Sequence, residues 1–548
     1  MVRFYFVNNT IGGNSIMYKK SSFVLLTVWC LLVVLIFRIF YVSFGKINDK
    51  VNTTAGGRYA GGVLYNSKGI IYDRNLIPLS GNQFVNYLII DPRNFDLTKT
   101  EYIAQVTDCD ITELYNKLKR ETPIVLKSFT DIIDISGVTV FKGTGRYAQN
   151  RVAEHVIGYL DSECIVGMSG VEKAYDSFLS SFSHSTKYRY YANAVRGMGG
   201  EQQIEFSNST DTLSGIMLTL DKRLCEVSKS VATKYIDKGC IIVNDCKTGE
   251  ILSLVSLPTY EVGKIADYSE KNNGELINNA LIRQSVGSVF KAVMAVCAFQ
   301  NNLDKFEYDC TGSVIVNGHM FMCQGGIKHG IQEIDNAFAN SCNCFFISLG
   351  QLLGYEKIIE TAKLLGLDSS IKISKDMYAE SAIFPKDNGE LALANLSIGQ
   401  GELMISPISI SRLFSLLCNG GSLVNPSIYM GTYIDGEVSN NREYIYKNKV
   451  IDDICAEKMK EMCIECVQQG TGKNAMPETG GAGGKTASAQ TGIFDEYGVE
   501  KLNTYFVGFY PADDPQYVIT VFAAGGKSGS STCAPVFKEI CDFISINY

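Results

Sequence analysis

The stretch TYFVGFYPADDPQYVITVFAAG (residues 504–525) decides the fold class of this chain. It holds two runs rich in β-branched and aromatic residues, separated by a turn segment of Pro and Asp, and this pattern predicts a β-hairpin. A second hairpin is predicted in GCIIVNDCKTGEILSLVS (residues 239–256), where a Lys-Thr-Gly turn joins two further β-rich runs. Between the hairpins the pattern is mostly helical. Strands at both ends of a domain predict an α+β fold, in which one central antiparallel sheet is closed by N- and C-terminal strands and a helical subdomain packs on it.

Length, net charge and cysteine content narrow the classes of protein to which this chain can belong. The chain has 548 residues, which predicts two or three domains. Its net charge of −7 argues against a dedicated nucleic-acid-binding protein, because neutralising phosphates requires a basic face. The 17 cysteines are an odd number and are scattered along the chain, which is not typical of a secreted disulfide framework.

An apolar run near the N-terminus predicts a membrane anchor. SSFVLLTVWCLLVVLIFRIFY (residues 21–41) is long enough to cross a bilayer as a helix. The run is preceded by the basic residues Arg3, Lys19 and Lys20. Positive charge on this side favours a cytoplasmic N-terminus over residues 1–21, an anchor over residues 22–41 and an extracytoplasmic remainder. The alternative is a removed signal peptide, but no small-residue cleavage site follows the run. We therefore expect a single-pass protein of the cell membrane.

The rest of the chain divides into two predicted domains. Residues 42–209 contain short alternating strands and polar, Tyr-rich stretches, which predict a separate and less compact N-terminal domain. A linker is expected around residues 197–211. Residues 210–548 contain both hairpins and the helical segments, and they form the second predicted domain.

The tetrad Ser288-Val289-Phe290-Lys291 opens an almost wholly apolar helical stretch. A serine at a helix start and a lysine three residues later lie on one face, so the amine can take the hydroxyl proton. Burial among apolar neighbours would lower the pKa of Lys291 and make a neutral base available. The alternative is a serine that caps the helix beside a solvated lysine.

Two later motifs carry polar groups that suit the same chemistry. In ANSCNCFF, Ser341 and Asn343 precede a hydrophobic helix, either as cleft residues on a turn, as a helix cap or as a pair of buried polar residues. In GGKTA, Lys485 and Thr486 follow a run of glycines and would hold a substrate carboxylate at the edge of a strand. A phosphate-binding loop is the alternative for GGKT, but that pattern needs a glycine where this chain has Thr479.

In this order, the S-x-x-K, S-x-N and K-T-x elements resemble the signature of the penicilloyl serine transferases. Further segments resemble those of the class B penicillin-binding proteins, the monofunctional peptidoglycan transpeptidases. These segments are SKGIIYDRN (67–75), RYAQNRVAEHVIGYLDSECIVGMSGVEKAYD (146–176), LSIGQGELMISPISI (396–410) and VGFYPADDP (507–515). The resemblance implies a serine β-lactamase/transpeptidase-like fold, in which the central antiparallel sheet carries helices on both faces. It also implies an extended pedestal domain over residues 42–209 and a transpeptidase domain over residues 210–548.

The resemblance implies acyl transfer in two steps. Ser288 would attack the D-Ala-D-Ala carbonyl of a stem peptide with Lys291 as its base, and D-alanine would leave. The amine of a second stem peptide would then resolve the ester and form the cross-link, and β-lactams would acylate the same serine. No cofactor is needed for this chemistry. A polytopic glycosyltransferase partner would make the glycan strands that are joined.

The resemblance also implies roles for the other motif residues. Ser341 would relay a proton to the leaving amine, and Asn343 would hold the donor amide. Lys485 would supply positive potential, and Thr486 would bind the terminal carboxylate. The backbone N–H group of Ser488 would form the oxyanion hole together with that of the nucleophile.

One position departs from the family pattern. A literal K-T-G occurs at residues 247–249, but it precedes the nucleophile and lies in a predicted hairpin turn, where Thr-Gly is ordinary. We therefore assign the third motif to Lys485, and Ala487 then stands where the family usually has Gly. A methyl group there is expected to crowd the ligand or to require a strand shift.

A loop between the first two motifs has candidate metal ligands. The stretch YDCTGSVIVNGHMFMCQGGIKHG contains Asp309, Cys310, His319, Cys323 and His329. These residue types predict a structural tetrahedral zinc site with Cys310, Cys323 and His329, completed by Asp309 or alternatively by His319. The other interpretations are a disulfide between the two cysteines, or unpaired loop cysteines with surface histidines.

Two rival functions share some of these features. A β-lactamase has the same motifs and hydrolyses its acyl-enzyme, but such enzymes are usually shorter and have no pedestal. A membrane-anchored β-lactam receptor or scaffold would usually have several membrane spans, whereas one is predicted here. Among transpeptidases, division, elongation and sporulation all stay open as the process served.

Overall fold

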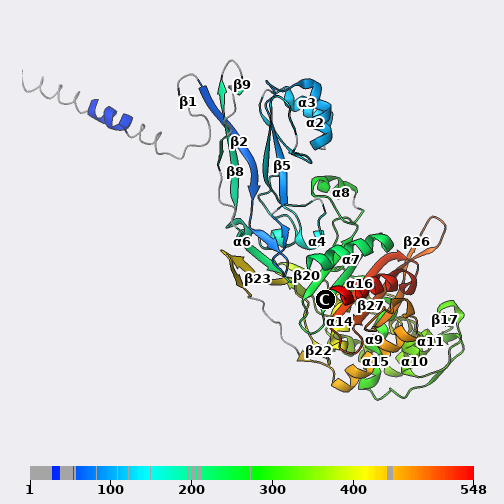
Figure 1. Cartoon of the computed structure of the whole chain (residues 1–548). Coiled ribbons are helices and arrows are strands. Elements are labelled where there is room, and N and C mark those ends of the chain that lie inside the picture. The colour runs from blue at the N-terminus through cyan, green and yellow to red at the C-terminus, as the bar shows by residue number, and fades with distance from the viewer. Residues whose placement is uncertain are drawn as a thin grey trace, which may run out of the picture.

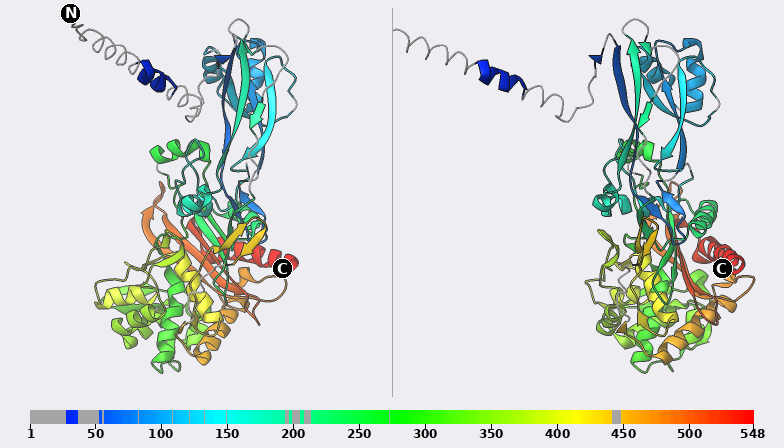
Figure 2. Two further views of the ribbon diagram at one scale, coloured as in Figure 1. Left: turned by 90° about the vertical axis from the view of Figure 1, so that its left-hand side faces the viewer. Right: turned by 60° about the vertical axis from the view of Figure 1, so that its left-hand side comes forward.

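The structure is a computed structural model of the chain. It describes residues 28–36, 53–54, 57–81, 83–107, 109–120, 122–131, 133–148, 150–193, 197–198, 205–207, 213–271, 273–440 and 448–548. An elongated N-terminal domain stands on a larger C-terminal body, and the C-terminus lies on that body near the junction (Figures 1 and 2).

The predicted anchor is only partly described. Residues 1–27 and 37–52 lie outside the described residues. Residues 28–36 form a helix with exposed apolar side chains such as Trp29. In the part of the chain that the structure describes, no helix has both the length and the apolar character that a membrane span needs. The transmembrane helix over residues 22–41 therefore stays a prediction.

The N-terminal domain is built around a long antiparallel ribbon (Figure 1). Strand β2 (Gly57–Ser67) pairs with β8 (His184–Asn193). This sheet also contains β1 (Thr53–Thr54), β9 (Gly197–Met198) and β10 (Glu205–Ser207). A second antiparallel sheet has the order β6-β5-β7 and packs against two helices through Leu88, Ile103 and Leu114. Its elements are β5 (Gln83–Ile90), β6 (Ile124–Ser128), β7 (Val138–Gly145), α2 (Thr100–Thr107) and α3 (Ile111–Leu118).

A shared sheet joins the two domains. Strand β3 (Ile70–Tyr72), from the N-terminal part, pairs in parallel with β11 (Gly215–Leu218), and β11 pairs with β23 (Tyr429–Ile434). The full order is β24-β23-β11-β3-β4, with β4 (Pro78–Ser80) and β24 (Glu437–Ser439) at the edges. The predicted boundary at residues 209/210 lies outside the described residues and stays a prediction.

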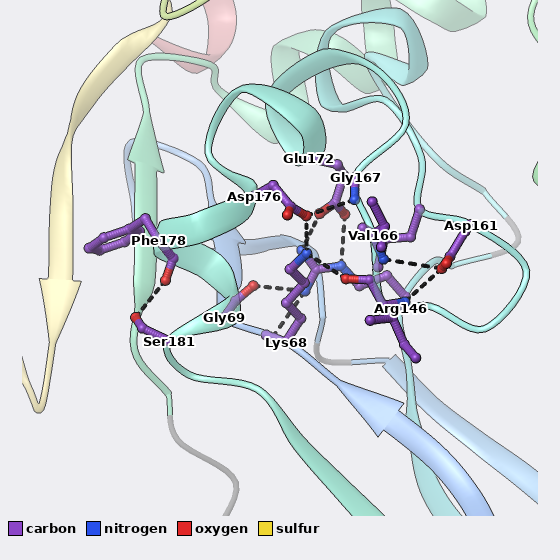
Figure 3. A network of polar contacts seen from close by, with 12 residues as sticks. Lys68, Gly69, Arg146, Asp161, Val166, Gly167, Glu172, Asp176, Phe178 and Ser181 are labelled. Atoms are coloured by element: carbon purple, nitrogen blue, oxygen red, sulfur yellow. Dashed lines mark hydrogen bonds and ion pairs between the residues drawn. The ribbon is translucent and has the colours of Figure 1, made fainter.

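A buried polar network lies at the same junction (Figure 3). Arg146 donates to both carboxylate oxygens of Glu172, with Nε to Oε1 at 2.7 Å and Nη2 to Oε2 at 2.6 Å. Its Nη1 also donates to the backbone oxygens of Lys68 at 3.0 Å and of Gly69 at 2.7 Å. Lys68 forms an ion pair with Asp176. The network thus brings together the two N-terminal segments that resemble class B motifs.

The central sheet of the C-terminal domain is antiparallel throughout, with the strand order β13-β12-β28-β27-β26. Its strands are β12 (Gly239–Asp245), β13 (Ile251–Leu257), β26 (Gly483–Phe494), β27 (Glu500–Tyr510) and β28 (Tyr517–Gly526). The two predicted hairpins are β12–β13 and β27–β28, and they meet where β12 pairs with β28. The predicted closure of one sheet by N- and C-terminal strands is therefore confirmed.

Helices cover both faces of this sheet, as predicted. On one face, α7 (Lys222–Tyr235) and α16 (Ala534–Asn547) pack on apolar residues such as Ile241 and Phe506. The other face carries α9 (Lys291–Gln300), α11 (Asn343–Leu353), α14 (Pro407–Cys418) and α15 (Asp453–Gln468). The Asp221 carboxylate caps α7 by accepting from the N–H groups of Arg223 and Leu224, which is why this helix begins where it does.

Shorter elements complete the description. The helices among them are η1 (Leu97–Lys99), α4 (Glu154–Ile157), α5 (Gly170–Ala174), α6 (Asp176–Ser180), η2 (Val262–Lys264), α8 (Ile265–Lys271), η3 (Gly287–Phe290), η4 (Gln324–Gly326), α10 (Ile334–Ala339), α12 (Tyr355–Leu364), α13 (Glu390–Ser397), η5 (Lys473–Ala475) and η6 (Gly529–Cys533). The strands are β14 (Gln284–Ser285), β15 (Tyr308–Cys310), β16 (Ser313–Val316), β17 (His319–Met322), β18 (Gly330–Gln332), β19 (Ile371–Ser374), β20 (Met377–Ala379), β21 (Met404–Ile405), β22 (Ser422–Leu423) and β25 (Asn448–Lys449).

Candidate active site

Ser288 lies in the 3-10 turn η3, which leads directly into α9. The backbone N–H of Lys291 donates to the Ser288 carbonyl, so the two residues share one helical turn, as predicted. Ser288 is half-buried, and Lys291 has no exposed side-chain surface. The N-cap of α9 is Phe290. The alternative of a capping serine beside a solvated lysine is therefore wrong.

Lys291 joins the first motif to the second. Its Nζ atom donates to the Ser341 carbonyl at 2.8 Å, to Ser341 Oγ at 3.2 Å and to Asn343 Oδ1 at 2.8 Å. Burial, with a further contribution from the charge of Lys485, lowers the pKa of Lys291 to about 7. A substantial fraction of this amine is therefore neutral near neutral pH and can accept a proton.

The turn between α10 and α11 presents Ser341 and Asn343 to the lysine. Ser341 has a φ of 55°, in the left-handed region that non-glycine residues rarely adopt. This backbone conformation turns both the carbonyl and the hydroxyl of Ser341 toward Lys291. Asn343 is the first residue of α11, and its Nδ2 donates to the Met322 carbonyl at 2.9 Å. Ser341 thus lies just before α11 and Asn343 at its start, and the prediction that both line a cleft stays a prediction.

Strand β26 carries the third motif at the edge of the central sheet. Among the described residues its strand partner is β27 alone, and the nucleophile turn η3 packs against this strand. Lys485 is fully buried, its Nζ donates to the Thr486 carbonyl at 3.1 Å, and burial lowers its pKa. The Thr486 and Thr471 hydroxyls are hydrogen-bonded at 2.7 Å. Thr471 has no motif signal in the sequence, so its place beside the site could be found only from the structure.

The K-T-G at residues 247–249 lies at the opposite side of the sheet, in the turn between β12 and β13. Lys247 forms an exposed ion pair with Asp514, and Gly249 has a φ of 71°. The prediction that this K-T-G lies in a hairpin turn is confirmed.

The Ala487 side chain is buried. It is 3% exposed and belongs to the hydrophobic core that also contains Val289 and Tyr505. Both predicted effects of this residue, crowding of the ligand and a strand shift, stay predictions.

The nucleophile turn packs directly on β26. Gly287 has a φ of 58°, and a Cβ atom on it would lie 3.1 Å from the carbonyl oxygen of Ser488. Ser488 is half-buried, and its hydroxyl accepts from the Gly529 N–H at 3.2 Å. The residues predicted to supply the oxyanion-hole N–H groups, Ser288 and Ser488, therefore belong to backbone segments in contact.

Comparison with known proteins agrees with this geometry. Residues 239–542, which are more than half of the chain, match the family model "Penicillin binding protein transpeptidase domain". The chain belongs to this family.

Relatives in the family cover most of the chain. It is 26% identical over 564 residues to "Stage V sporulation protein D" of Bacillus subtilis, covering 96% of this chain and 85% of that protein. It is 25% identical to "Peptidoglycan D,D-transpeptidase MrdA" of Acinetobacter baumannii, covering 87% of this chain and 80% of that protein. The predicted relationship to class B penicillin-binding proteins is confirmed.

A solved structure supports the fold. The D,D-transpeptidase domain of a peptidoglycan glycosyltransferase from Eggerthella lenta superimposes with a TM-score of 0.63. It is 18% identical and covers 88% of this chain and 99% of that chain. The predicted transpeptidase-like architecture of mixed helices and sheets is therefore confirmed.

A cluster of thiols lies directly beside the active site of this family member. Ligand atoms of Cys310, Cys323, His329 and Cys342 all lie within 4.8 Å of one another. The Sγ atom of Cys310 is 3.6 Å from that of Cys323 and 3.5 Å from His329 Nδ1, and the Sγ atoms of Cys323 and Cys342 are 3.8 Å apart. Tetrahedral zinc with Zn–S near ~2.3 Å and Zn–N near ~2.0 Å requires ligand separations of about 3.5–3.8 Å, and these three separations lie in that range.

The fourth member of the cluster differs from the prediction. Asp309 is exposed on β15, because adjacent residues of a strand point to opposite faces and Cys310 points inward. His319 is also exposed. Cys342 takes the fourth position, although in the sequence it reads only as the middle residue of the S-x-N motif. Cys344 is also near, with its Sγ 3.5 Å from that of Cys323.

The thiols of the cluster are free. The 3.6 Å separation of Cys310 and Cys323 is far from the length of a disulfide, about 2.05 Å. Hydrogen bonds with Cys342 and Cys344 lower the pKa of Cys323, and the hydrogen bond with Cys323 raises the pKa of Cys342. A deprotonated thiol is the form that binds a metal ion.

Proposed function

We propose that this chain is a serine-type peptidoglycan D,D-transpeptidase that cross-links stem peptides through an acyl-enzyme on Ser288 and is acylated by β-lactams at the same residue. One observation about Lys291 carries the proposal. This lysine is fully buried, lies one helical turn from Ser288, and donates hydrogen bonds to Ser341 and Asn343. The names of the relatives support the substrate class.

Acylation would proceed at Ser288. The Ser288 Oγ atom forms a bond to the carbonyl carbon of the penultimate D-alanine, and the neutral amine of Lys291 takes its proton. The backbone N–H groups of Ser288 and Ser488 hold the carbonyl oxygen as it becomes negative. When the C–N bond breaks, the proton passes by way of Ser341 to the leaving amine, and D-alanine departs.

Deacylation would run the same steps in reverse with a second stem peptide. The amine of this peptide attacks the ester carbon and forms the new peptide bond as the bond to Ser288 Oγ breaks. The proton of the amine passes by way of Ser341 to Lys291, and Lys291 returns a proton to Ser288. Lys485 and the hydroxyls on β26, led by that of Thr486, would hold the terminal carboxylate of the donor. Asn343 would orient Lys291 and hold the donor amide.

The proposal is tested by incubating the protein with a fluorescent penicillin and measuring the mass of the product. We expect one label at Ser288 that is lost in Ser288→Ala and is released slowly. Ser285→Ala, three residues upstream, is the matched control and should keep the label. Rapid turnover would indicate a β-lactamase, and a label that persists in Ser288→Ala would contradict the nucleophile.

We also propose that the domain lies outside the cell membrane on a single N-terminal anchor over residues 22–41, with a pedestal over residues 42–209 and the transpeptidase domain over residues 210–548. The apolar run and the basic residues ahead of it support this topology. A polytopic glycosyltransferase would be the partner. Fractionation of cells that express the full chain or residues 42–548 tests the anchor: membrane association should require the first 41 residues.

Zinc is proposed as a structural ion held by Cys310, Cys323, His329 and Cys342. Its sulfur and nitrogen ligands would join the loop after β15 to the turn that carries Ser341 and Asn343. The ion would take no part in acyl transfer. Metal analysis of the purified protein tests this, because the absence of stoichiometric zinc would reject the site.

Spore formation is the process that we propose for the enzyme, since its similarity to the Bacillus subtilis sporulation protein extends over nearly the whole chain. Deletion of the gene should reduce heat-resistant spores, and a wild-type copy but not a Ser288→Ala copy should restore them. Normal sporulation in the deletion strain would contradict this assignment.

A further inference from the structure

Gln400 lies between the nucleophile turn and the edge strand. It follows α13 and is half-buried. Its Nε2 donates to the Ser488 carbonyl at 3.4 Å, and its Oε1 accepts from the Gln490 N–H at 3.1 Å. The side-chain amide therefore pairs with the open edge of β26 on both sides of Ala489, as the backbone of another strand would.

The residue before Gln400 contacts the nucleophile turn. The Gly399 carbonyl accepts from the Gly287 N–H at 2.9 Å. Gly399 has a φ of 74°, and a Cβ atom on it would lie 1.9 Å from the Gly287 carbonyl oxygen. Only glycine fits there. Two consecutive residues thus connect the turn that carries Ser288 to the strand that carries Ser488.

This connection matters because the oxyanion hole has two halves on separate elements. One N–H group comes from η3 and the other from β26, and each must lie about 2.7–3.1 Å from the same oxygen atom. A displacement of ~0.5 Å is already outside the tolerance of such a site. Hydrogen bonds that fix both backbones to one short segment hold the two N–H groups at a constant separation.

We infer that Gln400 is a positioning residue for the oxyanion hole, an inference that rests on the proposed function. Its amide holds the peptide groups on either side of Ala489 and so fixes the direction of the adjacent Ser488 N–H. Gln400 does not touch the reacting atoms. Loss of its side chain would slow formation of the tetrahedral intermediate while leaving binding of the ligand nearly unchanged.

The test uses the rate constant of acylation and the dissociation constant of the preceding complex, measured separately with a chromogenic β-lactam. In Gln400→Ala the rate constant should fall by about 10- to 100-fold, as for a displaced oxyanion-hole donor, and the dissociation constant should change by less than ~3-fold. In Gln400→Glu the carboxylate keeps the bond from Gln490 but cannot donate to Ser488, so this variant should be similarly slow.

Gln490→Ala is the matched control. The Gln490 side chain donates to Glu500 on the exposed part of the hairpin at 3.0 Å, whereas its backbone N–H, which binds Gln400, is unchanged by the substitution. This variant should acylate at the wild-type rate. A boronic acid supplies a second measurement, because its tetrahedral adduct with Ser288 occupies the oxyanion hole, and its affinity for the Gln400 variants should fall by the same factor as the rate constant.

Wild-type acylation in Gln400→Ala and Gln400→Glu would overturn the inference. So would a slow rate with unchanged affinity for the boronic acid, or an equal loss in Gln490→Ala. If Gln400→Ala unfolds, Gln400→Glu and Gln400→Asn at a wild-type Tm decide the question. A wild-type protein that is never acylated would contradict the proposed function itself, and the inference with it.

Discussion

Lys291 shows how a single residue acquires its chemistry from its surroundings. Its side chain is fully buried, three oxygen atoms accept from its Nζ, and the Phe346 ring lies 5.4 Å away. Carbonyl and amide oxygens can accept hydrogen bonds from the amine without adding a negative charge that would keep it protonated. Burial and the nearby Lys485 therefore determine its low pKa.

The pKa of Lys291 predicts the pH dependence of acylation. Below a pKa of about 7 the amine is protonated and cannot act as a base, so the rate should rise through this range and level off above it. The increase should approach tenfold per pH unit on the acidic side. Rates of penicillin acylation from pH 5.5 to 9, with Tm measured at each pH, check this. A flat profile would show that Lys291 is not the base.

Lys291→Arg separates charge from basicity. Arginine keeps a positive charge at this position but stays protonated, so it cannot accept the proton of Ser288. We expect acylation to slow by about 10²- to 10⁴-fold. Intact-protein mass spectrometry over time provides the rates, and Lys247→Arg, in the K-T-G of the hairpin turn, serves as the control. Acylation of Lys291→Arg at the normal rate would remove the lysine from the mechanism.

At this scale the sequence predicted much of the site. The residue types of the three motifs, and their order, suit one reaction. They identified Ser288, Lys291, Ser341, Asn343 and Lys485, and the structure brings these residues together. Thr471 was not identifiable, because a single hydroxyl that contributes through a tertiary contact has no local pattern. Gln400 lies in the segment 396–410 that resembles the family, but its contacts with β26 join residues far apart in the chain and cannot be read from that segment.

Among the elements, the segment from β15 to β18 depends most on its cysteines for a fixed position. Its hairpin β16–β17 exposes Ile315, Met320 and Met322, and the Met322 carbonyl holds Asn343. Few of its residues reach the core, so a bound ion would replace a hydrophobic core in fixing this segment. Its sequence predicted two cysteines and one histidine of the cluster. The fourth position depends on which face of β15 is buried and on the approach of α11.

Removal of the cluster should loosen the active site as well as the loop. In Cys323→Ser we expect loss of zinc, a stability lower by more than about 3 kcal/mol, and slower acylation because Asn343 loses its fixed partner. Zinc content, Tm and acylation rate are measured on the same samples. Cys164→Ser, a half-buried cysteine of the N-terminal domain, is the control and should keep all three values. Unchanged Tm in Cys323→Ser would contradict a structural metal site.

For the whole molecule, the elements at the junction determine the relative position of the two domains. The hairpins of the central sheet were predictable because their signals are local, with strands and turn adjacent in the sequence. The parallel pairing of β3 with β11 was not, because it joins residues 70–72 to residues 215–217, and nothing in either segment specifies the other. The buried pair of Arg146 and Glu172 forms part of the same long-range arrangement.

Arg146→Ala should destabilise the junction strongly. It leaves the fully buried Glu172 carboxylate without its bidentate partner, and loss of one member of a buried pair costs about 3–5 kcal/mol. Differential scanning calorimetry should show a lower Tm. The control is Lys142→Ala, which removes an exposed ion pair with Asp131 and should leave the Tm nearly unchanged. Equal Tm values for the two variants would contradict a stabilising role for the network.

The shared sheet also determines how the molecule carries mechanical load. Separating the N-terminal domain from the C-terminal body requires breaking the β3–β11 backbone hydrogen bonds, and the Arg146 network fixes Lys68 and Gly69, just before β3, to Glu172. Just after β11, α7 begins and packs on the central sheet. A pull or a twist applied to β2 is therefore passed through residues 68–69 to β3, across the hydrogen bonds of β3 to β11, and from β11 into α7 and the central sheet.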